Sequence, residues 1–149
     1  MRLYCLLMCL GLFFSLTANA NRNLNEVPYI EVITSDAYPV SGLNQIQKNG
    51  IAVRLYNLDD GKRMVSQLEA NLPKSEQAAK KAMALRIKKI GDHALKKKFS
   101  DAFQAIIIGT QYGVTRHPAV VFNHGQAVVY GVTDLTRALT LYRHWTVSK

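Results

Sequence analysis

Apolar and polar positions divide the chain into a strand–helix–strand start, a helical middle and a hairpin–helix end. Runs rich in β-branched and aromatic residues at 27–34 and 51–56 predict two strands, with a short helix at 43–48 between them. The connection over residues 35–50 is long enough for a right-handed crossover. We therefore expect the first two strands to be parallel neighbours.

The middle of the chain, residues 59–112, follows helical periodicity. We expect Asp59 or Asp60 to cap a helix that ends at Leu72-Pro73, because proline disfavours the helical conformation of the residue before it. A second helix opens at Ser75. The apolar positions of this segment are predicted to face the core: Met64, Val65, Leu68, Ala79, Met83, Ile87, Ile90, Leu95, Phe99, Ala102, Phe103, Ile106 and Ile107.

The last third of the chain predicts a hairpin followed by a helix. The apolar run 118–122 is typical of a central strand, residues 123–126 have turn chemistry, and 127–130 form the returning strand. A final helix begins at Thr133-Asp134. Its inward face carries Leu135, Ala138, Leu139 and Tyr142.

Residues 1–20 have the pattern of a secretory signal peptide. Arg2 precedes an apolar run at 3–16, and the small-x-small sequence at 18–20 supplies a cleavage site. The apolar run is shorter than the roughly 20 residues that span a bilayer. We therefore expect a cleaved signal, an exported mature domain at 21–149, and no stable membrane anchor.

Both cysteines of the sequence, Cys5 and Cys9, lie inside this predicted signal. The mature chain would then carry no thiol, and disulfide exchange requires a thiolate nucleophile. A disulfide oxidoreductase or isomerase mechanism is therefore excluded for the mature protein unless a partner supplies both thiols. A single domain of this length can bury a core of ordinary size without disulfides.

Positive charge concentrates in the helical middle. The whole sequence has a formal net charge of +9, and residues 74–98 hold nine Lys and Arg residues against two acidic ones. Such a basic face either keeps the protein soluble or binds an acidic partner, nucleic acid or anionic lipid. The sequence leaves open whether this segment packs on the domain or projects from it. The candidate basic face consists of Lys80, Lys81, Lys88, Lys89, Lys96, Lys97 and Lys98.

The order of elements is that of the α/β thioredoxin fold, with a long helical insertion. Residues 112–126 resemble the thioredoxin segment that carries the cis-proline, the third strand and the hairpin turn. The resemblance places Pro118 at the cis-proline and implies a cis bond there. The stretch 34–40 corresponds to the place of the thioredoxin Cys-x-x-Cys pair and contains no cysteine.

The thioredoxin resemblance also implies a peptide-binding groove at one end of the sheet. Two hypotheses remain for it. Either the groove binds partner proteins without redox chemistry, or Pro118 only shapes the entry to its strand. The candidate groove residues are Tyr38, Pro39, Arg116, His117 and Pro118.

Together with the signal and the lysine-rich middle, segments 35–42, 112–122 and 129–135 resemble a family of exported proteins encoded on integrating conjugative elements. This resemblance implies a non-enzymatic periplasmic component, or assembly factor, of a conjugative type IV secretion (mating-pair) apparatus that binds other exported proteins. Two alternatives are a basic nucleic-acid-binding accessory protein, which predicts steeply salt-dependent DNA binding, and a periplasmic chaperone, which predicts promiscuous capture.

No catalytic, cofactor or metal site is predicted. His117 and His124 lie at opposite ends of one predicted strand, His93 and His144 lie on separate predicted helices, and no closely spaced set of His, Asp and Glu accompanies them. The adjacent pair Asp59-Asp60 sits where a helix cap is expected, and the glycines are too dispersed for a phosphate loop. The sequence therefore predicts a protein that is not an enzyme.

Overall fold

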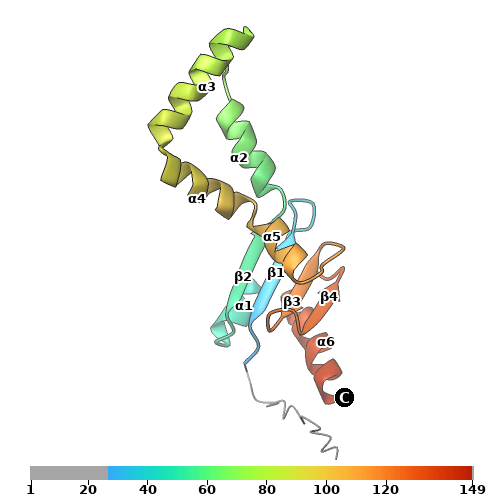
Figure 1. The fold of residues 1–149 in the computed structure, drawn as a ribbon. Helices are drawn as coiled ribbons and strands as arrows, with labels where there is room; N and C mark the ends of the chain where they lie inside the picture. Colours follow the sequence, from blue (N-terminus) through green and yellow to red (C-terminus); the bar gives the residue numbers. More distant parts are fainter. Residues whose placement is uncertain (1–26, 149) are drawn as a thin grey trace, which may run out of the picture.

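The computed structural model describes residues 27–148, so the predicted signal at 1–20 lies outside the described residues. This part of the chain is mixed α/β, with a four-stranded sheet and six helices (Figure 1). Within residues 27–148, no helix combines the length and the apolar character that crossing a membrane requires.

The sheet has the strand order β2-β1-β3-β4. β1 and β2 are parallel, as predicted, and β3 pairs antiparallel with both β1 and β4. The hairpin formed by the last two strands is confirmed. The strands are β1 (Ile30–Thr34), β2 (Val53–Asn57), β3 (Ala119–Phe122) and β4 (Ala127–Tyr130).

The first two strands begin later than the sequence pattern predicts. Pro28 has no amide hydrogen to donate to a ladder, and β1 begins two residues after it. Ile51 donates its backbone N–H back to the Ile46 carbonyl at 3.3 Å, so it closes the preceding helix and β2 starts at Val53. A run of apolar residues therefore does not show at which residue strand pairing begins.

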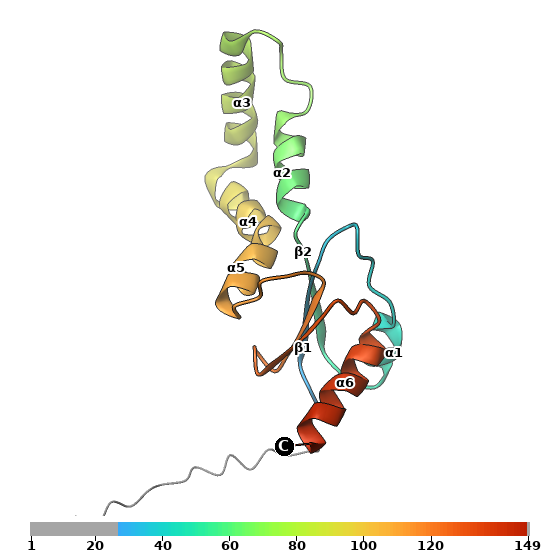
Figure 2. The same cartoon turned by 90° about the vertical axis from the view of Figure 1, so that its right-hand side faces the viewer.

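Helices cover both faces of the sheet (Figure 2). α1 (Leu43–Lys48) and α6 (Leu135–Val147) pack on one face, where Phe122 is fully buried and its ring stacks on Tyr142 with centroids 4.2 Å apart. α5 (Gln104–Gln111) packs on the other face through Ile108, against Ile33 and Val121. The core therefore has two layers separated by the sheet.

Two of the predicted helix starts are stabilised by side-chain caps. The Asp134 carboxylate accepts hydrogen bonds from the backbone N–H groups of Thr136 and Arg137, at 2.9 and 3.3 Å. The Ser75 hydroxyl accepts one from Ala78 at 3.2 Å. Asp59 occupies the N-cap position of α2, as predicted, but its side chain makes no capping bond, because its carboxylate accepts a bond from the Asp36 N–H at 2.8 Å instead.

Three helices project beyond the sheet as a helical arm, residues 60–102 (Figures 1 and 2). They are α2 (Asp60–Glu69), α3 (Glu76–Ile90) and α4 (Asp92–Ala102), which contact one another. The lysine-rich segment therefore projects. Neither α3 nor α4 contains a buried residue.

The prediction that the apolar positions of the middle face the core is wrong for most of them. Of that set only Met64 is buried, whereas Val65, Phe99, Ile106 and Ile107 are exposed. The three helices of the arm contact one another but enclose no core, since α3 and α4 bury none of their residues. A break at Phe103, between α4 and α5, also resets the helical phase, so Ala105 and Ile108 face the sheet instead.

Candidate functional site

Two distant segments meet at one end of the sheet. Tyr38 lies in the loop after β1, and His117 lies two residues before β3 begins. Their rings contact edge to face, with centroids 5.6 Å apart and an interplanar angle of 77°. The His117–Pro118 peptide bond is cis, as the thioredoxin resemblance implies. The structure therefore brings these predicted groove residues together.

The loop that carries Tyr38 is anchored to the end of β1. The Tyr38 N–H donates to the Ser35 carbonyl at 2.9 Å, and the Thr34 hydroxyl donates to the Tyr38 carbonyl at 2.6 Å. Thr34 and Ser35 are buried, whereas the Tyr38 side chain stays exposed. This tight turn presents the aromatic ring toward solvent from a fixed backbone.

The other predicted groove residues have different surroundings. The Arg116 guanidinium lies 5.1 Å from the ring centroid of Tyr130 on β4, a cation–π contact. Pro118 is buried, and its carbonyl accepts a bond from the Gly131 N–H at 2.9 Å. Pro39 is exposed in the same loop as Tyr38. Pro118 thus supports the backbone, while Arg116 and His117 are open to solvent.

An apolar hollow of about 230 Å³ adjoins His117. Ile33 and Leu58 contribute to its wall from the sheet side, and Ile106 contributes from α5. Sequence reasoning missed this wall because it assigned Ile106 to the core. The hollow and the Tyr38–His117 pair together form the candidate groove.

A buried carboxylate lies in the middle of the sheet, at Glu31 of β1. Its side chain is 4% exposed, and its Oε1 accepts a hydrogen bond from the Tyr56 hydroxyl at 3.1 Å. Its Oε2 has no hydrogen-bond partner within residues 27–148 and lies 3.6 Å from His124 Nδ1. Sequence reasoning missed this residue, although a lone charge between Ile30 and Val32 was the available signal.

Tyrosines surround this carboxylate and remain neutral beside it. Burial, and then the neighbouring Glu31 carboxylate, raise the pKa of Tyr112 to about 12. Burial is also the largest cause that raises the pKa of Tyr29 and of Tyr56. The Tyr112 hydroxyl lies 3.3 Å from His124 Nδ1. His124 belongs to the turn between β3 and β4, so this turn contacts the tyrosines around Glu31.

The raised pKa of Tyr112 predicts a loss of stability at alkaline pH. The contribution is fully present below the ordinary tyrosine pKa of about 10, and it is lost as the pH rises toward 12, because the unfolded chain ionises first. Replacing Tyr112 with phenylalanine should reduce the stability loss between pH 8 and 11 by about 1 kcal/mol, after allowance for solvent screening. Urea unfolding of the wild type and of Tyr112→Phe at the two pH values measures this difference. Equal losses of stability in the wild type and the variant would contradict the prediction.

The predicted basic face lies on α3 and α4 of the helical arm, and all seven of its lysines are exposed. Two of them form surface ion pairs, Lys80 with Glu76 at 2.6 Å and Lys97 with Asp101 at 2.7 Å. Such exposed pairs contribute little to stability. The face is therefore available for contacts with a partner.

Comparisons with known proteins identify a family but no activity. In the part of the chain that the structure describes, no group of three His, Cys, Asp or Glu side chains could hold a metal ion. Neither a curated protein nor a solved structure matches the chain. Residues 27–148, nearly all of the predicted mature domain, match one family. The chain therefore belongs to the family described as "Protein of unknown function (DUF1525)".

Proposed function

We propose that this protein is a non-enzymatic, exported partner-binding protein with a thioredoxin-like sheet domain. In this proposal it acts in the periplasm as a component or assembly factor of a conjugative type IV secretion apparatus. The strand order β2-β1-β3-β4, the parallel first pair and the cis-proline before β3 support the thioredoxin-like assignment. The assignment to conjugation is supported by the sequence resemblance to exported proteins of integrating conjugative elements.

The observation that carries the proposal is the contact between Tyr38 and His117 beside an apolar hollow. An exposed aromatic ring, an imidazole and an apolar wall are suited to a peptide segment of another protein. Residues 27–148 contain no cysteine, so this groove offers binding without a thiol for exchange. A fold can keep a binding surface without the chemistry found elsewhere on that fold.

The groove is tested by replacing Arg116 and His117 together with alanine. We expect at least a tenfold loss in the capture of secretion-apparatus components from cells that carry the conjugative element. The melting temperature should fall by less than about 4 °C, because the lost cation–π contact at an exposed site is worth only about 0.5–1 kcal/mol. Quantitative pull-down and thermal unfolding measure the two effects.

The matched control replaces Arg137 and His144, an exposed arginine and an exposed histidine on α6. It removes the same residue types and should leave capture unchanged. Normal capture by the groove variant would contradict the proposal. Capture of many unrelated exported proteins by the wild type would instead favour a general periplasmic chaperone.

Nucleic-acid binding is the second candidate, and the exposed arm favours it. Phe99 is 37% exposed, and its ring is stacked on Phe103 with centroids 6.0 Å apart. The expectation that both rings face the core is therefore wrong for Phe99, and an aromatic surface lies among the lysines. A periplasmic location argues against this candidate, because DNA in transfer is expected inside the secretion channel.

A further inference from the structure

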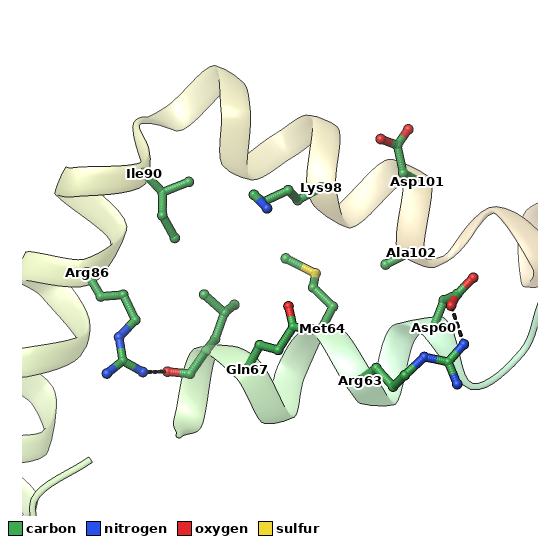
Figure 3. Close-up of a pocket in the computed structure, with 10 residues that line it drawn as sticks. Asp60, Arg63, Met64, Gln67, Arg86, Ile90, Lys98, Asp101 and Ala102 are labelled. Atoms are coloured by element: carbon green, nitrogen blue, oxygen red, sulfur yellow. Dashed lines mark hydrogen bonds and ion pairs between the residues drawn. The ribbon is translucent and has the colours of Figure 1, made fainter. Parts of the chain in front are cut away.

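The helical arm encloses an open hollow between its three helices, which we call the arm hollow (Figure 3). Its volume is about 480 Å³, within the roughly 300–1,000 Å³ typical of ligand sites. Met64 and Leu68 line it from α2, and Ile90 lines it from the end of α3. Its floor is therefore apolar, although it lies far from the core of the sheet.

Three cations line the arm hollow, together with the carboxylates of Asp60 and Asp101. The Arg63 guanidinium is held in ion pairs with Asp36 and Asp60. Arg86 donates to the Leu68 carbonyl, which leaves the other donors of its guanidinium unused within residues 27–148. Lys98 has no hydrogen-bond or ion-pair partner in this described part of the chain.

We propose that the arm hollow binds an acidic amphipathic helix of a partner protein. Apolar side chains of that helix pack on Met64, Leu68 and Ile90, and its carboxylates meet Arg86 and Lys98 at the rim. α3 and α4 bury none of their own residues, so a partner helix supplies the apolar burial that the arm lacks. This surface is separate from the groove at Tyr38 and His117.

Charge complementarity selects an acidic partner over a second copy of this chain. The helical arm, residues 60–102, holds eleven Lys and Arg residues against five Asp and Glu residues, a net charge of +6. Two such arms repel each other when they approach. An acidic helix is attracted by the same charge, and its association is weakened by salt.

A charge reversal inside the hollow tests the proposal, with a matched reversal on the same helix as its control. Lys98 lines the hollow and Lys96 does not. Two residues along a helix correspond to a rotation of about 200°, so these lysines face nearly opposite directions. Lys98→Glu and Lys96→Glu make the same change in net charge at two exposed positions of α4.

The probe is a fluorescein-labelled, designed 16-residue helix with leucines on one face and glutamates on the others. Its binding to the purified protein is followed by fluorescence anisotropy. We expect micromolar binding by the wild type, at least fivefold weaker binding by Lys98→Glu, and less than a twofold change for Lys96→Glu. A second peptide with lysines in place of the glutamates should bind at least tenfold more weakly than the first.

Equal weakening by the two substitutions would overturn the proposal, because it would indicate diffuse attraction to the whole arm. No binding of the glutamate peptide at 1 mM would overturn it as well. Displacement of the peptide by a single-stranded oligonucleotide, at lower concentration than by unlabelled peptide, would show that the arm prefers nucleic acid and would also overturn it. None of these results bears on capture through the groove.

Discussion

Replacing Phe122 with alanine should lower the free energy of unfolding by about 3–5 kcal/mol. Phe122 is fully buried at the end of β3, and its ring is stacked on Tyr142 of α6. The substitution removes the transfer free energy of the ring and leaves a cavity between the sheet and α6. A loss of this size is a large fraction of the roughly 5–15 kcal/mol that stabilises an ordinary domain.

Urea unfolding followed by the fluorescence of Trp145, the single tryptophan, measures this effect because Trp145 lies on α6. The control is Leu85→Ala on α3 of the helical arm, where the leucine is 61% exposed. A surface position of this kind should change stability by less than about 0.5 kcal/mol. Equal losses of unfolding free energy in Phe122→Ala and Leu85→Ala would contradict this account, in which the core lies around the sheet and the arm is exposed.

The same substitution at two helical glycines should have opposite effects. A Cβ at Gly61 of α2 would lie 2.7 Å from Phe103 Cε1, closer than the packing allows without movement. We expect Gly61→Ala to lower stability by about 1–2 kcal/mol, since overpacking costs roughly 1–3 kcal/mol and the helix preference of alanine offsets part of that. The side chain that must move lies where the arm joins α5.

Gly109 of α5 is the matched position. A Cβ there would meet Ile33 Cδ1 at 3.6 Å, an ordinary van der Waals contact. Gly109→Ala should therefore raise the free energy of unfolding by about 0.5–1 kcal/mol through helix propensity. Thermal or urea unfolding of both variants measures the pair. A gain in stability from Gly61→Ala would contradict the packing described. A loss of about 1–2 kcal/mol from Gly109→Ala would contradict it as well.

Local patterns predicted the sheet and its connections well. The hairpin of β3 and β4 is encoded by two apolar runs separated by turn residues, and the start of α6 by the cap at Asp134. The parallel pairing of β1 and β2 follows from the length of their connection. Each of these features depends on residues that are close in the sequence.

The position of the helical middle could not be predicted in the same way. An apolar stripe on a helix has the same periodicity whether it faces a sheet or another helix, so the pattern did not distinguish core from arm. The break at Phe103 has no glycine or proline to mark it. The sequence pattern therefore treated Ile106 and Ile107 as core positions, whereas the structure buries Ile108.

The groove and the buried carboxylate depend on contacts between distant segments. The contact between Tyr38 and His117 was predictable only through the resemblance to thioredoxins. The surroundings of Glu31 combine side chains from β1, β2 and the β3–β4 turn, including Tyr56 and His124, and no local pattern joins these residues. Sequence periodicity predicts helices and strands, whereas a site built from distant side chains can be located only in the folded structure.

Site-specific photocrosslinking in cells that carry the conjugative element tests the central claim most directly. A photoreactive residue is placed at Thr115, an exposed residue that lines the hollow beside His117, and in a second protein at Lys48, the exposed last residue of α1. The proposed function predicts that one or two secretion-apparatus components crosslink at position 115 and not at position 48. Crosslinks to the same proteins at both positions, or none at position 115, would contradict partner binding through this groove.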